Sequence, residues 1–124
     1  MPKSLSNSRI AELCSLLTKY RFDLSDEKSL QSEMEDVFIA EDIDHKREYR
    51  LSNKDIVDFM LCDSIAVECK LKGHQKKAIY RQLCRYAEHN EVKELVLVSN
   101  ISMGLPQSIN EKPLYYINLT NSWM

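Results

Sequence analysis

The sequence has little of what marks the unusual classes of protein. Only 2 of its 124 residues are glycine and 3 are proline, which argues against a disordered chain and against modules separated by linkers. No apolar run approaches the roughly 20 residues of a membrane span, and no signal-peptide pattern follows Met1. We therefore expect no membrane contact and a cytoplasmic protein, located in the nucleoid or host cytoplasm if a phage encodes it.

The cysteines also lack a pattern that would indicate zinc or disulfides. Cys14, Cys62, Cys69 and Cys84 form no Cys-x-x-Cys pair, and two of them lie within apolar patterns. We interpret them as reduced, buried thiols of an intracellular protein. The length predicts a single domain, 1–124, with a modest hydrophobic core.

The net charge of −2 does not by itself indicate a nucleic-acid-binding protein, but the charge is unevenly distributed. Residues 1–44 hold 5 basic and 10 acidic residues, whereas residues 45–93 hold 11 basic and 7 acidic ones. Local cationic density favours contact with phosphates because such contact releases counterions. Solvated helix faces give the same pattern, so the charge is only a permissive signal.

The periodicity of apolar residues predicts an α/β domain with a small mixed sheet flanked by helices. Ser25 is the expected N-cap of the second helix. A helix between two parallel strands normally forms a right-handed crossover. The predicted helices are 8–20, a second beginning near residue 26, and about 75–90; the predicted strands are 45–52, 56–61, 65–71, 94–99 and about 114–119, with a turn at Asp63-Ser64.

Three charged residues lie inside the two central apolar strands. Asp58 interrupts the first strand, and Glu68 and Lys70 lie two residues apart in the second. Side chains alternate between the faces of a strand, so Glu68 and Lys70 share one face and Cys69 points to the other. Charged groups are rarely buried without a partner or a bound ion. This pattern favours a metal site.

The chemistry of these groups suits metal-dependent hydrolysis of phosphodiesters. Carboxylates on adjacent strands, with the Cys69 backbone carbonyl, would hold Mg²⁺ or Mn²⁺ through oxygen ligands. Such an ion polarises phosphoryl oxygens and lowers the pKa of a bound water. Lys70 would position or deprotonate that water and offset the charge that develops on the phosphate.

Together, these elements resemble the PD-(D/E)XK nuclease superfamily. The resemblance covers about residues 26–99 and includes the order helix, three strands, helix, strand. Val57 replaces the proline of the family's name. The residues that carry the resemblance are Glu33 in a helix, Asp58-Phe59 and Glu68-Cys69-Lys70 in strands, and Gln82-Leu83-x-x-Tyr86 in the next helix, which is similar to the motif of the RecB-like branch.

The resemblance implies a restriction-endonuclease-like core of order αβββαβ, as in small nucleases of the Holliday-junction-resolvase type. By this likeness Glu33 is the helix acid near the metal, Asp58 and Glu68 are metal ligands, and Lys70 is the catalytic lysine. The resemblance implies that Gln82 and Tyr86 support the site or contact nucleic acid, and we add to these contacts the basic residues nearby: Lys72, Lys76, Lys77, Arg81 and Arg85.

We therefore expect a Mg²⁺- or Mn²⁺-dependent deoxyribonuclease acting on branched or duplex DNA. A core of this size would find its substrate through its own basic surface, as a homodimer, or through a protein partner. Two alternatives remain. One is a binding module with a weak site, since Glu68-x-Lys70 is also an ordinary ion pair of one strand face. The other is an interaction subunit that docks through the acidic residues 1–44.

Overall fold

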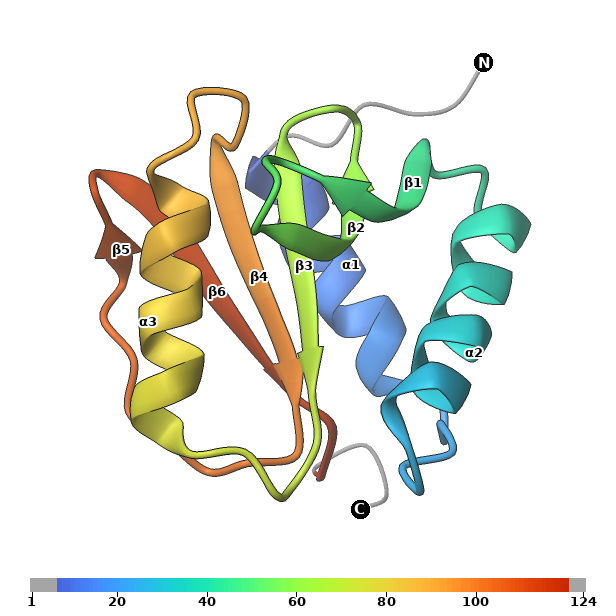
Figure 1. The fold of residues 1–124 in the computed structure, drawn as a ribbon. Coiled ribbons are helices and arrows are strands. Elements are labelled where there is room, and N and C mark those ends of the chain that lie inside the picture. Colours follow the sequence, from blue (N-terminus) through green and yellow to red (C-terminus); the bar gives the residue numbers. More distant parts are fainter. Residues whose placement is uncertain (1–6, 121–124) are drawn as a thin grey trace.

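The computed structural model describes the backbone of residues 7–120 and the side chains of residues 10–120. Helices alternate along the chain with the strands of one mixed sheet, which confirms the α/β class (Figure 1). The ends of the predicted domain, 1–6 and 121–124, lie outside these residues. The helices are α1 (Asn7–Thr18), α2 (Glu27–Ala40) and α3 (Lys76–Ala87); the strands are β1 (His45–Arg50), β2 (Ile56–Leu61), β3 (Ile65–Lys70), β4 (Glu94–Ser99), β5 (Ser108–Ile109) and β6 (Lys112–Asn118).

All six described strands form one sheet in the order β1-β2-β3-β4-β6-β5. The pairs β1–β2, β2–β3 and β5–β6 are antiparallel, whereas β3–β4 and β4–β6 are parallel. Helix α3 connects the adjacent parallel strands β3 and β4, as a crossover requires. No helix within residues 7–120 has the length and apolar character that a membrane span needs.

Two hydrophobic clusters cover opposite faces of the sheet. The first joins α1 and α2 to the sheet through residues such as Leu17, Phe38 and Phe59. The second packs α3 against the other face and includes Ile79 and Leu83. In Figure 1, α3 lies in front of the sheet and α1 behind it. The central strands are therefore covered on both faces, which explains why β4 is almost wholly apolar.

Several predicted boundaries change by a few residues, and one local prediction is wrong. The N-cap of α2 is Asp26 rather than Ser25: an Asp26 carboxylate oxygen accepts a hydrogen bond from the Ser29 backbone N–H at 2.8 Å. The β2–β3 turn contains the predicted Asp63 and Ser64 but begins one residue earlier, at Cys62: Leu61 pairs with Ile65, and the Ser64 backbone N–H donates to the Leu61 carbonyl at 3.1 Å. Cys62 and Asp63 have positive φ, 52° and 61°.

Candidate active site

The β2–β3 pairing is regular only near the turn. Its last paired residues are Phe59 and Val67, and continuation of that register would place Asp58 opposite Glu68. At that point, two hydrogen bonds between side chain and backbone replace the pairing of the two backbones. The Asp58 backbone N–H donates to Glu68 Oε1 at 3.4 Å, and the Cys69 backbone N–H donates to Asp58 Oδ2 at 2.7 Å. The hairpin thus brings both carboxylates between its two strands.

Strand β1 is also irregular at this level. Its pairing with β2 includes Arg47 with Phe59 and Tyr49 with Val57, and Glu48 between them has a φ of 53°. A positive φ is uncommon for any residue other than glycine. The distortion places Val57 in the cluster under α3, on the same side as Met60 rather than Phe59. Asp58 therefore leaves the alternation that a regular strand would impose.

Asp58, Glu68 and Lys70 form a cluster of charged side chains. Glu68 lies at its centre and is only 4% exposed. Its Oε2 lies 2.9 Å from Lys70 Nζ, and its Oε1 accepts a hydrogen bond from the Tyr86 hydroxyl at 3.2 Å. Burial, and then repulsion from Asp58, raise the pKa of Glu68 to about 7. Burial also raises the pKa of Asp58. The ionised forms of the two carboxyl groups are therefore disfavoured relative to those of exposed acids.

Lys70 is a charged partner of both carboxylates. Burial alone would lower its pKa, but the Glu68 carboxylate and then Asp58 outweigh burial and raise it. A lysine with a raised pKa keeps its proton, so in this arrangement Lys70 stabilises negative charge and is a poor base. Cys69 points to the opposite face, as predicted, where its thiol lies 3.5 Å from the Met34 sulfur. Use of the Cys69 carbonyl as a metal ligand stays a prediction.

The helix acid beside the cluster is Glu27, and the structure does not bring Glu33 there. Glu33 accepts hydrogen bonds from the Asp23 backbone N–H at 3.1 and 3.3 Å and lines a separate hollow beside Tyr20. Glu27 Oε2 instead accepts from the Leu71 N–H at 3.0 Å and lies 2.6 Å from His74 Nε2. Its charge acts on the pKa values of both Asp58 and Lys70.

The spacing of residues in α2 places Glu27 on the buried face of this helix. Residues three and seven positions apart lie on one helix face. Glu27, Leu30 and Met34 have this spacing, and Met34 contacts Cys69 of β3. The stripe that faces the strands therefore begins one turn before Leu30, at an acidic residue.

Helix α3 brings Gln82 and Tyr86 to the site. The Tyr86 hydroxyl is bonded to both the Ile56 carbonyl and Glu68, so this side chain joins α3 to β2 and β3. Burial, followed by the charge of Glu68, raises the pKa of Tyr86, which keeps the phenol protonated as a donor. Gln82 lines a groove of about 300 Å³ together with Lys70, His74, Arg81 and Arg85. The Gln-Leu-x-x-Tyr pattern therefore places one residue on the carboxylates and one in the groove.

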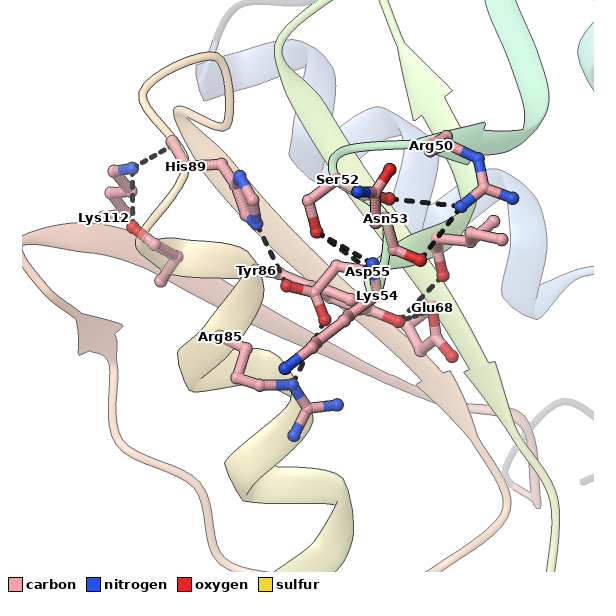
Figure 2. A network of polar contacts seen from close by, with 12 residues as sticks. Arg50, Ser52, Asn53, Lys54, Asp55, Glu68, Arg85, Tyr86, His89 and Lys112 are labelled. Carbon is pink, nitrogen blue, oxygen red and sulfur yellow. Dashed lines mark hydrogen bonds and ion pairs between the residues drawn. The ribbon is translucent and has the colours of Figure 1, made fainter.

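A second polar network, which the sequence did not indicate, fixes the C-terminal end of α3. Asp55 is 8% exposed; one of its oxygens accepts from Arg85 Nε at 3.2 Å and the other lies 3.0 Å from His89 Nε2. Burial alone would raise the pKa of Asp55, but the bonds from His89 and Arg85 outweigh burial and lower it. Figure 2 shows this network beside Tyr86 and Glu68. Arg85, predicted to contact nucleic acid, is thus partly held by Asp55.

The remaining predicted contacts divide into two groups. Lys72 is exposed beyond the end of β3, where its backbone N–H donates to Asn100 Oδ1 at 2.9 Å. Lys76, Lys77 and Arg81 are exposed on α3. Helix α3 has no acidic residue, so its outer surface is uniformly cationic.

The cluster offers two carboxylates to a metal. Within residues 7–120 there is no group of three or more His, Cys, Asp or Glu residues arranged around a metal position. Mg²⁺ and Mn²⁺ nevertheless fit the chemistry of Asp58 and Glu68. Burial disfavours the ionised forms of both carboxyl groups, which a cation would offset, and Mg²⁺ commonly binds proteins through one or two carboxylates while keeping several waters. No protein-family model, no curated protein and no solved structure matches this chain.

Proposed function

We propose that this chain is a Mg²⁺- or Mn²⁺-dependent nuclease that hydrolyses phosphodiester bonds of DNA. The observation that supports it is the juxtaposition of Asp58, Glu68 and Lys70 where β2 and β3 separate, with Lys70 also lining the groove under α3. A buried acid beside a half-buried one costs folding free energy, and such costs concentrate at functional sites. A restriction-endonuclease-like core is part of the proposal, supported by the succession α2-β1-β2-β3-α3-β4.

Asp58 and Glu68 would hold the metal ion. When bound, the ion polarises the phosphoryl group and lowers the pKa of a coordinated water. Its charge would also favour the ionised forms of both acids, since metal binding and protonation compete for the same oxygens. Lys70 keeps its proton and would face the charge that develops on the phosphate. Tyr86 would hold Glu68 in position through its hydroxyl.

The same site distinguishes the nuclease from two other functions, a binding module and an interaction subunit. A binding module with a weak site would keep the cationic surface of α3 and would not depend on Asp58 or Lys70. An interaction subunit would expose an apolar patch on α1 or α2. Tyr20, which follows α1, and Ile39 of α2 are exposed, 40% and 64%, but they line two different hollows. We therefore favour the nuclease.

The test is cleavage of labelled supercoiled, linear, single-stranded and four-way-junction DNA with Mg²⁺, Mn²⁺ or EDTA. Lys70→Ala and Asp58→Ala should each abolish metal-dependent cleavage. Lys46→Ala and Asp63→Ala are matched controls, because these residues form an exposed ion pair at 2.9 Å on β1 and the β2–β3 turn. They should cleave like the wild type.

Two results would contradict the nuclease. One is cleavage that persists in folded Lys70→Ala and Asp58→Ala protein, which would trace it to a contaminant or another site. The other is tight DNA binding by the wild type without cleavage of any substrate, which would identify a binding module. Thermal unfolding of each variant shows that it is folded.

A further inference from the structure

A second cavity adjoins the groove that holds Lys70. Its volume is about 400 Å³, and it lies between the first half of α3 and the segment that follows β4, with Lys77, Tyr80, Met103 and Pro106 among its lining residues. Figure 1 shows that segment running beside α3 towards β5. The site described above uses neither Tyr80 nor this segment.

The cations of this cavity have no acidic partner. Lys76, Lys77 and Arg81 line it, and none of them forms an ion pair with another residue of the described chain. Other exposed cations of the same protein do pair: Lys28 with Glu48, and Lys46 with Asp63. Unpaired like charges on one helix repel each other, so an anion is the ligand that they favour.

Tyr80 adds an aromatic surface between these charges. Its side chain is 40% exposed, and Met103 and Pro106 give the cavity apolar walls. A ring exposed among cations is the arrangement that binds an unpaired nucleobase: the base stacks on the ring while the lysines contact the flanking phosphates. A base within a duplex is not available to such a ring, because it is stacked between its neighbours and must first be flipped out.

Arg81 connects this cavity to the candidate active site, since it lines both cavities. Lys70 lines the first cavity and Tyr80 lines the second. A strand that follows α3 would therefore place one phosphate near Lys70 and a nearby base against Tyr80.

We propose that the cavity around Tyr80 binds an unpaired base, and that the DNA substrate is single-stranded where it crosses α3. The proposal deepens the nuclease assignment by naming the substrate class, and it rests on that assignment for the position of the cleaved phosphate. The binding itself needs only the cavity, the unpaired cations and the exposed ring.

The experiment measures binding in EDTA, so that cleavage plays no part. Fluorescence anisotropy would compare a labelled single-stranded oligonucleotide with a duplex of the same sequence. Tyr80→Leu removes the ring and should weaken single-strand binding by about 5- to 150-fold, the range for loss of one base–aromatic stack. Tyr80→Phe keeps the ring and should stay within about twofold of the wild type. Duplex binding should change by no more than about twofold in either variant.

Tyr20→Leu is the matched control. Tyr20 is also 40% exposed, but it lines a hollow beside Glu33 and Asp36, away from α3. Single-strand binding should not change in this variant. The inference is overturned if Tyr80→Leu binds the single strand as tightly as the wild type, if Tyr80→Phe loses as much as Tyr80→Leu, or if single-strand and duplex binding fall equally.

Failure of this inference is distinguishable from failure of the nuclease proposal. Metal-dependent cleavage that requires Asp58 and Lys70, without any effect of Tyr80→Leu on binding, would keep the nuclease and discard the single-stranded path. Binding that depends on the Tyr80 ring, without cleavage, would confirm the path and leave a single-strand-binding module.

Discussion

Glu68 carries an electrostatic cost in the folded protein. Its carboxyl group is buried between two strands beside a second carboxyl group, so its ionised form is disfavoured in the folded protein. The unfolded chain has no such penalty. The free energy of unfolding therefore depends on pH through this residue, and the dependence can be measured without metal or DNA.

We expect the stability of the wild type, in EDTA, to fall relative to Glu68→Gln as the pH rises. Below pH 4.5 the carboxyl group is protonated in both states, so pH has no effect through it. Between pH 4.5 and about 7 the unfolded chain releases a proton that the folded protein holds, and stability falls; above about 7 the loss is complete. The shift of the Glu68 pKa corresponds to a loss of at most about 3 kcal/mol in the free energy of unfolding. Chemical denaturation of both proteins from pH 4 to 8 measures the difference.

A difference in stability that does not change with pH would show that Glu68 titrates normally. Groups common to both proteins cancel in this comparison, apart from their coupling to Glu68 itself. A growing advantage of the variant at high pH is the predicted sign, because glutamine cannot ionise.

Substitution of Glu27 and of Glu33 distinguishes which acid of α2 supports the site. Glu27→Gln should raise the Mg²⁺ concentration needed for half-maximal cleavage by about 10- to 100-fold, the usual effect of residues that support metal ligands. Its charge acts on Asp58 and Lys70, whereas Glu33 bonds only the Asp23 backbone at 3.1 and 3.3 Å. Glu33→Gln should stay within about twofold of the wild type. Metal titration of cleavage rates measures both, and the opposite ranking would restore Glu33 as the site acid.

The sequence was informative about Glu68 and Lys70 because a regular strand places alternate residues on one face. It could not place Asp58, since β2 departs from regular alternation there, at the level where Glu48 of β1 has a φ of 53°. The helix acid was misplaced for a related reason. The apolar stripe of α2 showed which face is buried, but only the packing of Met34 against Cys69 shows where along the helix the site lies.

At the scale of elements, α3 is held at its C-terminal end by polar bonds. Lys112 of β6 donates to the carbonyls of Ala87 and His89, each at 2.7 Å, and Asn110 donates to Ala87 at 3.1 Å. Asp55, just before β2, binds Arg85 and His89 (Figure 2). These bonds satisfy groups that a helix end leaves unpaired, and they fix the helix that carries Tyr86.

Asp55→Asn should lower the free energy of unfolding by about 2 kcal/mol. The amide can accept from only one of the two donors and places an N–H₂ group against the other. Asp63→Asn is the control: Asp63 is 70% exposed in its pair with Lys46, so its loss should cost less than about 0.5 kcal/mol. Urea denaturation at pH 7 measures both. Equal costs would show that the Asp55 network contributes no more than a surface ion pair.

The helices and strands were largely predictable, because the regular spacing of apolar residues along each of them indicates its type. β2 and β4 agree with the predicted ranges, whereas the short strand β5 was missed. Its hairpin with β6 turns at Asn110-Glu111, both of which have positive φ. Glutamate is not a residue that indicates such a turn, so the sequence predicted no strand between residues 99 and 114.

At the scale of the whole molecule, the sheet separates two surfaces of opposite charge. Helix α2 carries Glu27, Glu33, Glu35 and Asp36 against a single lysine, whereas α3 has no acidic residue at all. The two helices pack on opposite faces of the sheet. Under the proposed function, this separation reconciles a net charge near zero with binding of a polyanion, and it would place the binding surface on one side of the sheet.

We therefore expect matched charge changes on the two helices to have unequal effects on DNA affinity. Lys76→Gln with Lys77→Gln removes two positive charges beside Tyr80 and should weaken single-strand binding at least tenfold in 0.1 M salt. The slope of log affinity against log salt should fall by about 1.4, because each lost phosphate contact contributes about 0.7. Glu33→Gln with Asp36→Asn removes two negative charges from the other face and should change affinity less than about twofold, since salt screens charges beyond ~10 Å. Anisotropy titrations at several salt concentrations measure both pairs. Equal and opposite effects would mean that DNA responds only to net charge, and that α3 is not its binding surface.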